Sequence, residues 1–313
     1  VNGEPNSVFL EIFFKTLKNK NYKSPIILIS SLEILMFHMK KLKFKKKIKI
    51  INYKNINEYN LNHKYINLIN IKFKSVSNLK KITNNSNLFI ERSFDVALKL
   101  IKLGFTKKMI NGPISKKNFL NKKYLGITEY LAKRSNSKKV AMLIYNKELS
   151  VCPITTHLPL KKVAKKITKK EIYGKVDLIT NFYKRYRKKN PNIAILGLNP
   201  HCESIDKFNE DEKIIKPAVK YLNNNGYNVS GPFSADTIFL KNNRKKFDVI
   251  IGMYHDQVLT PLKTIYEYDA INITLGLPYT RISPDHGPNL KMIGKNTSNP
   301  KSLENAITFL DKN

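Results

Sequence analysis

Short apolar runs alternate with longer amphipathic stretches along most of the chain. Runs of strand length lie at residues 25–30, 47–53, 107–113, 139–146, 149–156, 192–198, 247–253 and 270–276. The stretches 91–104 and 210–226 repeat apolar residues at helical spacing and end at a glycine. This alternation predicts a mostly parallel sheet covered by helices on both faces. Residues 143–151 have the pattern of a tight hairpin, so we expect the sheet to be mixed.

Length and composition favour a folded protein of a reducing compartment. With 313 residues and 42% hydrophobic content, the chain can bury a core in one large or two closely associated domains. No apolar run is long enough to span a membrane, and Cys152 and Cys202 form no disulfide framework, which predicts a cytoplasmic protein without a membrane partner. The chain opens in a turn-like Asn-Gly-Glu-Pro at 2–5, so we expect a preceding start or strand to be missing.

The net charge of +34 would suit a nucleic-acid partner. However, the charge comes mostly from lysines spread over the whole chain, and only six residues are arginine. No helix-turn-helix, zinc-finger or RNA-binding pattern accompanies them. Biased amino-acid usage with a solvated lysine surface is the simpler interpretation, and we predict that nucleic acid is not the partner.

Three of the six histidines come just after predicted strands. His157 follows the run 149–156, His201 follows 192–198, and His255 follows 247–253. Ligands of open α/β sheets bind at the carboxyl ends of the strands, so imidazoles gathered there predict a metal site with open positions for substrate. A single histidine in a strand-end turn is more often a hydrogen-bonded structural residue. The shared position of three of them favours the metal site.

Charged residues accompany these histidines. Asp256, next to His255, suits either support of the imidazole or proton transfer. Asp236 is as well explained by a helix N-cap as by a place in the site. Lys263, Asn272 and Arg281 follow at intervals of nine residues and together suit a clamp for phosphate or carboxylate.

Motifs along almost the whole chain occur in one family's order and spacing. They are GEP at 3–5, NGPISK at 111–116, GITEYLA at 126–132, TTHLPL at 155–160, GLNPH at 197–201, GPFSADTIF at 231–239, MYHDQ at 253–257, NITLGLP at 272–278 and RISPDHG at 281–287. Together they resemble the 4-hydroxythreonine-4-phosphate dehydrogenase family of pyridoxal phosphate biosynthesis.

The resemblance implies two α/β/α domains around a mixed, mostly parallel sheet, similar to isocitrate and isopropylmalate dehydrogenases, with the active site in the interdomain cleft. We expect a first domain of residues 1–130 plus about 285–313. We expect a second domain of residues 131–284, which carries the metal ligands and the dimer interface. The active site would be shared between the subunits of a homodimer.

The resemblance also implies an activity and its residues. The expected reaction is the NAD-dependent oxidation and decarboxylation of 4-phosphooxy-L-threonine to 3-amino-2-oxopropyl phosphate, in pyridoxine 5'-phosphate biosynthesis. The expected metal is zinc, or alternatively magnesium, manganese or cobalt, and it is held by histidines drawn from both subunits. The family's residues map to the metal ligands His157, His201 and His255, the substrate contacts Thr128, Lys263, Asn272 and Arg281, and the aspartates Asp236 and Asp256, with Asp256 the candidate for proton transfer.

Three segments depart from the family pattern. Ile127 stands where the family has a substrate-contacting histidine, Ser-Val-Phe-Leu at 7–10 replaces a glycine-rich turn, and residues 202–209 lack the usual glycines. These departures keep two alternatives open. One is the same chemistry on a related phosphorylated hydroxy acid such as a phosphothreonate, and the other is a catalytically weakened paralogue.

Overall fold

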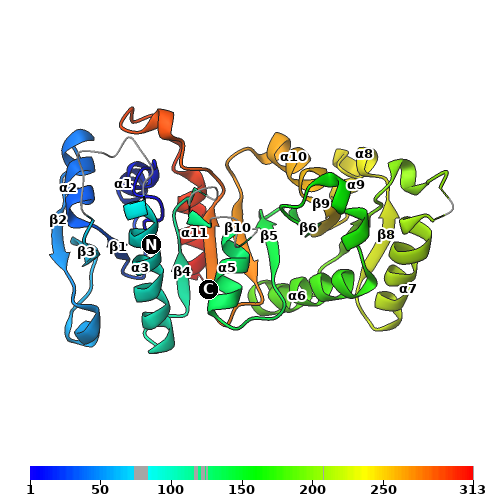
Figure 1. Ribbon diagram of the computed structural model, residues 1–313, viewed down its shortest axis with the longest axis horizontal. Helices are drawn as coiled ribbons and strands as arrows, with labels where there is room; N and C mark the ends of the chain where they lie inside the picture. The colour runs from blue at the N-terminus through cyan, green and yellow to red at the C-terminus, as the bar shows by residue number, and fades with distance from the viewer. Residues whose placement is uncertain (74–83, 116–118, 121–123, 125, 207, 313) are drawn as a thin grey trace. The chain divides into compact units, whose positions relative to one another are not determined.

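The chain folds into two compact units, which are described separately (Figure 1). The computed structural model describes residues 1–73, 84–115, 119–120, 124, 126–206 and 208–312. Unit 1 combines Val1–Tyr124 with Tyr279–Asn313, and unit 2 is Leu125–Pro278. Both boundaries lie a few residues before the expected ones at 130 and 284. The shift arises because helix α5 (Ile127–Arg134) falls within unit 2, whereas strand β11 (Thr280–Pro284) pairs with β4 (Lys108–Ile110) of unit 1.

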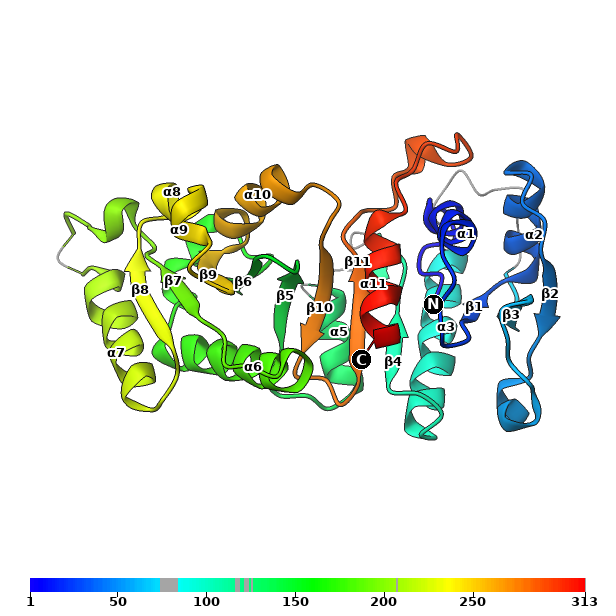
Figure 2. The ribbon, with the colours of Figure 1, turned by 180° about the vertical axis from the view of Figure 1, so that it is seen from behind.

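The described residues of unit 1 form two sets of parallel strands. The first has the order β1–β3–β2, and the second pairs β11 with β4. The bounds of the first set are Ile27–Ser30 for β1, Tyr65–Asn70 for β3 and Lys47–Ile50 for β2. The helices are α1 (Phe9–Asn19), α2 (Leu32–Lys41), α3 (Asn84–Lys102) and α11 (Lys301–Lys312), with short 3₁₀ helices at Tyr53–Glu58 and Leu290–Met292. Helix α11 packs beside β11 and α1 (Figure 2).

Unit 1 contains an apolar cavity of about 360 Å³ that is partly open to solvent. Side chains of α1, β1, α3, β4 and α11 line it, and none of the candidate site residues is among them. At one end, Val1 N donates a hydrogen bond to Ile110 O at 2.8 Å, and Gly112 N donates to Val1 O at 2.9 Å. Asn2 N donates to Ile29 O at 3.0 Å, so this segment is hydrogen-bonded to both β4 and β1.

Unit 2 contains the mixed sheet that the sequence predicts. Its strand order is β10–β5–β6–β9–β7–β8. Strands β6, β9, β7 and β8 are parallel, while β5 is antiparallel to both β6 and β10, which confirms the hairpin at 143–151. The bounds are Ala141–Tyr145 for β5, Ser150–Thr155 for β6, Ile193–Leu196 for β7, Val229–Phe233 for β8, Val249–Tyr254 for β9 and Ile271–Leu275 for β10.

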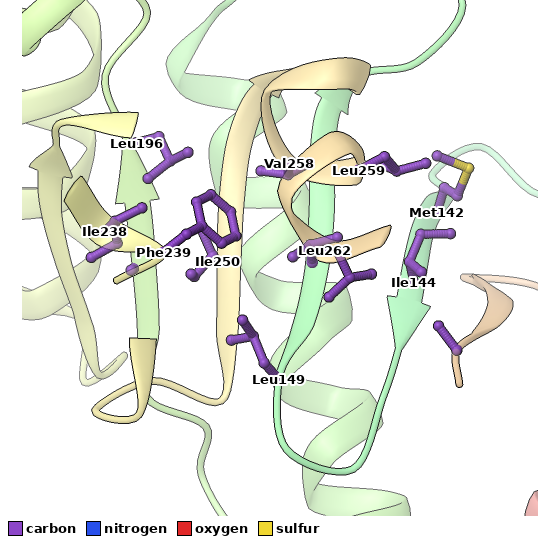
Figure 3. Close-up of a cluster of buried hydrophobic side chains, with 13 residues drawn as sticks. Met142, Ile144, Leu149, Leu196, Ile238, Phe239, Ile250, Val258, Leu259 and Leu262 are labelled. Carbon is purple, nitrogen blue, oxygen red and sulfur yellow. The ribbon is translucent and has the colours of Figure 1, made fainter. Parts of the chain in front are cut away.

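Helices cover both faces of this sheet. They are α6 (Lys169–Arg187), α7 (Lys216–Asn224), α8 (Ala235–Ile238), α9 (Lys241–Arg244) and α10 (His255–Tyr266), with a π-helix at Asp211–Ile215 and 3₁₀ helices at Leu160–Lys162, Ala164–Lys166 and Pro200–Cys202. Ile144 of β5 and Ile250 of β9 belong to one buried cluster with Val258 of α10 (Figure 3). Tyr145, the next residue of β5, packs on Phe182 of α6 with ring centroids 5.9 Å apart. Since neighbouring residues of a strand face opposite ways, α10 and α6 cover opposite faces.

The predicted strands are present, although most are shorter than the apolar runs. The run 47–53 forms a strand only over β2 and then turns into a 3₁₀ helix. Strands β3, β8 and β11 were not predicted, because a buried Asn67, the Gly231-Pro232 pair and the buried Arg281 interrupt their apolar patterns. Over the described residues, no helix has the length and apolar character needed to cross a membrane.

Candidate functional site

The three candidate histidines lie at one edge of the unit 2 sheet. Strand β6 ends at Thr155, β7 at Leu196 and β9 at Tyr254. These strands are parallel neighbours in the order β6–β9–β7, so their carboxyl ends meet at the same edge. His157, His201 and His255 follow those ends, as the sequence predicts. His255 is the first residue of α10, which begins directly after β9.

His255 is adjacent to two other candidate residues. Its ring lies 5.6 Å from the ring of His157, measured between centroids, at an interplanar angle of 41°. Its Nδ1 is 2.6 Å from Oδ1 of Asp256. A carboxylate only accepts hydrogen bonds, so Nδ1 carries the proton and the lone pair of a neutral ring is on Nε2. Asp256 therefore orients the imidazole and leaves Nε2 available to a ligand.

His201 lies beside Asp236. It sits in the 3₁₀ segment Pro200–Cys202 with φ +53°, in the left-handed region. The Ser234 hydroxyl donates to Asp236 at 2.6 Å, and this bond, followed by the charge of His201, holds the pKa of Asp236 below its ordinary value. Ser234 is the residue that precedes the first turn of α8, and Asp236 lies inside that turn. The N-cap interpretation of Asp236 is therefore wrong.

Two of the three candidate histidines lie close together. Within the described ranges, no group of three His, Cys, Asp or Glu side chains is placed to hold one ion. His157 and His255 are close neighbours, and imidazole nitrogen is a preferred zinc ligand, so this pair fits two positions of such a site. His201 is the third predicted ligand, and it lies beside Asp236.

The predicted substrate residues are divided between the two units. In unit 2, Lys263 is an exposed residue of α10, and Thr128 Oγ1 lies 3.4 Å from Thr274 Oγ1. Asn272 on β10 has a buried Oδ1 that no hydrogen-bond donor of the described residues reaches. In unit 1, Arg281 is buried on β11, and its Nε donates to Asn111 Oδ1 at 2.7 Å.

One further carboxylate lies close to His157. Glu129 Oε1 accepts a hydrogen bond from Thr156 Oγ1 at 3.4 Å. A Cβ added to Gly126 would stand 2.8 Å from Glu129 Oε2 and 3.2 Å from His157 Nδ1, so both side chains crowd the bare α-carbon of Gly126. Glu129 was not among the predicted site residues. Its place within the GITEYLA motif was the available signal.

Comparison with known proteins identifies relatives along nearly the whole chain. Residues 21–310 match the family model described as pyridoxal phosphate biosynthetic protein PdxA. The chain is 38% identical over 310 residues to 4-hydroxythreonine-4-phosphate dehydrogenase of Sulfurihydrogenibium sp., a match that covers 97% of this chain and 94% of the relative. Among solved structures, 4-hydroxythreonine-4-phosphate dehydrogenase from Klebsiella pneumoniae superimposes with a TM-score of 0.82 at 27% identity, covering 98% of this chain and 94% of that one.

A relative that is named for a different activity also matches. D-threonate 4-phosphate dehydrogenase of Pectobacterium atrosepticum is 36% identical over 185 residues, which is 59% of this chain and 57% of the relative. Both relatives are therefore named as dehydrogenases of a phosphorylated compound.

Proposed function

The chain belongs to the family of the pyridoxal phosphate biosynthetic protein PdxA, and on this premise we propose that it oxidises and decarboxylates 4-phosphooxy-L-threonine with NAD. The product would be 3-amino-2-oxopropyl phosphate, used in cytoplasmic pyridoxine 5'-phosphate biosynthesis. The observation that carries the proposal is the placement of His157, His201 and His255 at the carboxyl ends of three adjacent parallel strands. A relative matched over 94% of its own length bears the corresponding name.

We assign the metal ligands to these three histidines. His157 and His255 would bind from one subunit, and a homodimer would complete the set with a histidine of the second subunit. A divalent ion held there, zinc in the first instance, would polarise the oxygen on the carbon that is oxidised. Asp256 would hold the His255 ring through the 2.6 Å contact at Nδ1, so that Nε2 faces the ion.

The overall reaction defines the other roles. Oxidation moves a hydride from the hydroxyl-bearing carbon to NAD and releases the hydroxyl proton, which gives a β-keto acid. Loss of its carboxylate as CO₂ leaves an electron pair on the neighbouring carbon, which then takes up a proton. Asp256, whose side chain is 80% exposed, is the proposed residue for these proton transfers. Asp236, which lies beside His201, is proposed as a second catalytic carboxylate.

Phosphate recognition is assigned to Lys263, Thr128, Asn272 and Arg281. A lysine ammonium and a guanidinium each donate charge-assisted hydrogen bonds to phosphate oxygens. Binding energy from the phosphate would hold the reacting carbon in place, so truncating Lys263 should lower kcat/KM by roughly 10-fold to 100-fold. A substrate analogue without the phosphate should show little further loss on the same substitution.

The test is formation of NADH from 4-phosphooxy-L-threonine by purified protein, in the presence of zinc, magnesium, manganese or cobalt. We expect turnover that a chelator abolishes and added metal restores. His255→Ala should remove activity, whereas His63→Ala, a histidine outside the candidate site, should retain it. Turnover that is insensitive to the chelator would refute the metal assignment, and absence of turnover would refute the substrate.

A second candidate substrate is a phosphothreonate, favoured by Ile127 in the first turn of α5. An isoleucine side chain cannot donate the hydrogen bond of the histidine that the family has there. The two candidate substrates are distinguished by comparing kcat/KM for D-threonate 4-phosphate with kcat/KM for 4-phosphooxy-L-threonine. We expect the amino acid substrate to be preferred, and a preference for the threonate would transfer the proposal to that compound.

A further inference from the structure

One buried carboxylate holds the turn that leads to His201. Asp211 is fully buried at the start of the π-helix Asp211–Ile215. Its Oδ1 accepts a hydrogen bond from Leu198 N at 2.8 Å, and its Oδ2 accepts from Asn199 N at 3.2 Å and from Asn199 Nδ2 at 3.0 Å. Three N–H donors of a single turn therefore compensate the burial of this carboxylate.

The turn continues directly into two residues with unfavourable backbone conformations. His201 has φ +53° and Cys202 has φ +62°. Residues other than glycine rarely adopt this left-handed region without support from their surroundings. At the start of the turn, a Cβ on Gly197 would stand 2.7 Å from Asp211 Oδ1 and 2.6 Å from Cys202 Sγ. Asp211 and Cys202 thus pack on the bare α-carbon of Gly197, which fixes the path of the turn.

Gln257 connects this turn to the segment that carries His255. Its Nε2 donates to Gly197 O at 2.8 Å, and its Oε1 accepts from Met253 N at 2.7 Å. Gln257 lies in the first turn of α10, two residues after His255. One amide side chain therefore links the carboxyl end of β7 to the carboxyl end of β9.

We propose that Asp211 and Gln257 are positioning residues that set the places of His201 and His255, an inference that rests on the proposed function of those histidines. Neither residue is proposed to touch substrate or metal. Asp211 acts by holding Leu198 and Asn199, the part of the turn that leads into the left-handed conformation of His201. Gln257 acts by fixing the separation of the two strand ends. The competing explanation is that both residues contribute only to stability.

Asp211→Asn separates these explanations, because an amide replaces one accepting oxygen with a donor that faces an N–H group. Asp248→Asn is the matched control. Asp248 Oδ2 accepts a hydrogen bond from Asn192 N at 3.0 Å. These two residues immediately precede β9 and β7, so they lie at the amino ends of the strands whose carboxyl ends lead to the histidines. Gln257→Glu is the second variant, because a carboxylate retains the acceptor for Met253 N and loses the donor to Gly197 O.

The readouts are amide hydrogen exchange at Leu198 and Asn199, and zinc affinity measured by calorimetry with Zn²⁺ alone. In Asp211→Asn we expect faster exchange at both amides and a zinc affinity lower by about 10-fold to 100-fold. Asp248→Asn should change neither readout. Adding Cys202→Gly to Asp211→Asn should recover part of the affinity, because glycine adopts a positive φ without a side-chain penalty.

Unchanged exchange and affinity in Asp211→Asn, or equal losses in Asp211→Asn and Asp248→Asn, would overturn the proposal. If the unsubstituted protein binds no Zn²⁺, the metal assignment of the proposed function fails separately. The positioning role is then decided by the NMR signal of the His201 ring, which must shift in Asp211→Asn and stay in place in Asp248→Asn. If Asp211→Asn does not fold, Gln257→Glu decides in the same way through the signal of the His255 ring.

Discussion

Helix α10 approaches β9 closely because residue 252 has no side chain. A Cβ added to Gly252 would stand 2.5 Å from Val258 Cγ1 and 2.9 Å from Gln257 Oε1. Gly252→Ala must therefore displace the first turn of α10, which begins with His255. Overpacking of this kind costs about 1–3 kcal/mol of stability. We expect unfolding at a lower urea concentration together with weaker zinc binding.

The size of the effect can be isolated with a second substitution. Val258 is fully buried, and Val258→Ala removes two methyl groups, which costs about 2 kcal/mol by itself. In the double variant, the new Cβ at 252 occupies space that the lost Cγ1 vacates. The two losses should then fall short of additivity by roughly 1–2 kcal/mol, as is typical of residues in direct contact.

Urea unfolding followed by far-UV circular dichroism measures this cycle, since the chain contains no tryptophan for fluorescence. Gly174→Ala is the matched control, because a Cβ at this position in α6 meets no atom within 4 Å. It should stabilise the helix by about 1 kcal/mol. Additivity of Gly252→Ala and Val258→Ala within about 0.5 kcal/mol would refute the contact argument.

Substitutions at three further positions test unit 1. Burial raises the pKa of Glu4 to about 7 from an ordinary 4.5. The stability that the protonated carboxyl contributes is therefore present below pH 4.5 and is lost as the pH rises through 7. Glu4→Gln should raise the urea midpoint at pH 8 and leave it unchanged near pH 4. Asn111→Ala removes the acceptor of the buried Arg281 Nε and should cost about 1.5–3 kcal/mol in urea unfolding, whereas Asn111→Asp keeps an acceptor and should cost less. Ala97→Leu places apolar atoms in the unit 1 cavity and should add about 0.5–2 kcal/mol, measured as a higher Tm; a lower Tm would show that the cavity does not accept them.

The part of the candidate site that the sequence predicted depends on local pattern. Continuous apolar runs such as 192–198 and 247–253 indicated buried parallel strands, and the polar residue after each run indicated the carboxyl edge. His201 and His255 were found in this way, because a strand end brings them to the edge whatever the rest of the fold does. The hairpin at 143–151 was equally local, because few residues separate its two strands.

The part that the sequence did not predict depends on contacts between distant segments. Asp211 lies in the stretch 210–226, which was predicted only to be helical, and nothing nearby in the chain indicates that its oxygens accept from Leu198 and Asn199. Asp236 was judged a candidate N-cap, because the pattern alone does not separate the residue before a helix from one inside its first turn. Strand β11 was missed because a buried arginine, hydrogen-bonded to Asn111, breaks its apolar pattern.

Three glycines explain how these distant contacts shape the site. Gly126 is crowded by Glu129 and His157, Gly197 by Asp211 and Cys202, and Gly252 by Gln257 and Val258, all within 3.2 Å of an added Cβ. Each glycine is therefore near a candidate histidine: Gly126 is near His157 in space, and Gly197 and Gly252 shortly precede His201 and His255 in the chain. At each glycine, a polar side chain packs against the bare α-carbon. Spacing in the sequence could not predict the arrangement at Gly197 and Gly252, since the polar side chain and its glycine there belong to different elements, whereas Glu129 lies in the helical turn that Gly126 begins. The positions of the histidines consequently depend on the absence of a Cβ at three places, and alanine at any of them should weaken zinc binding more than Gly174→Ala does.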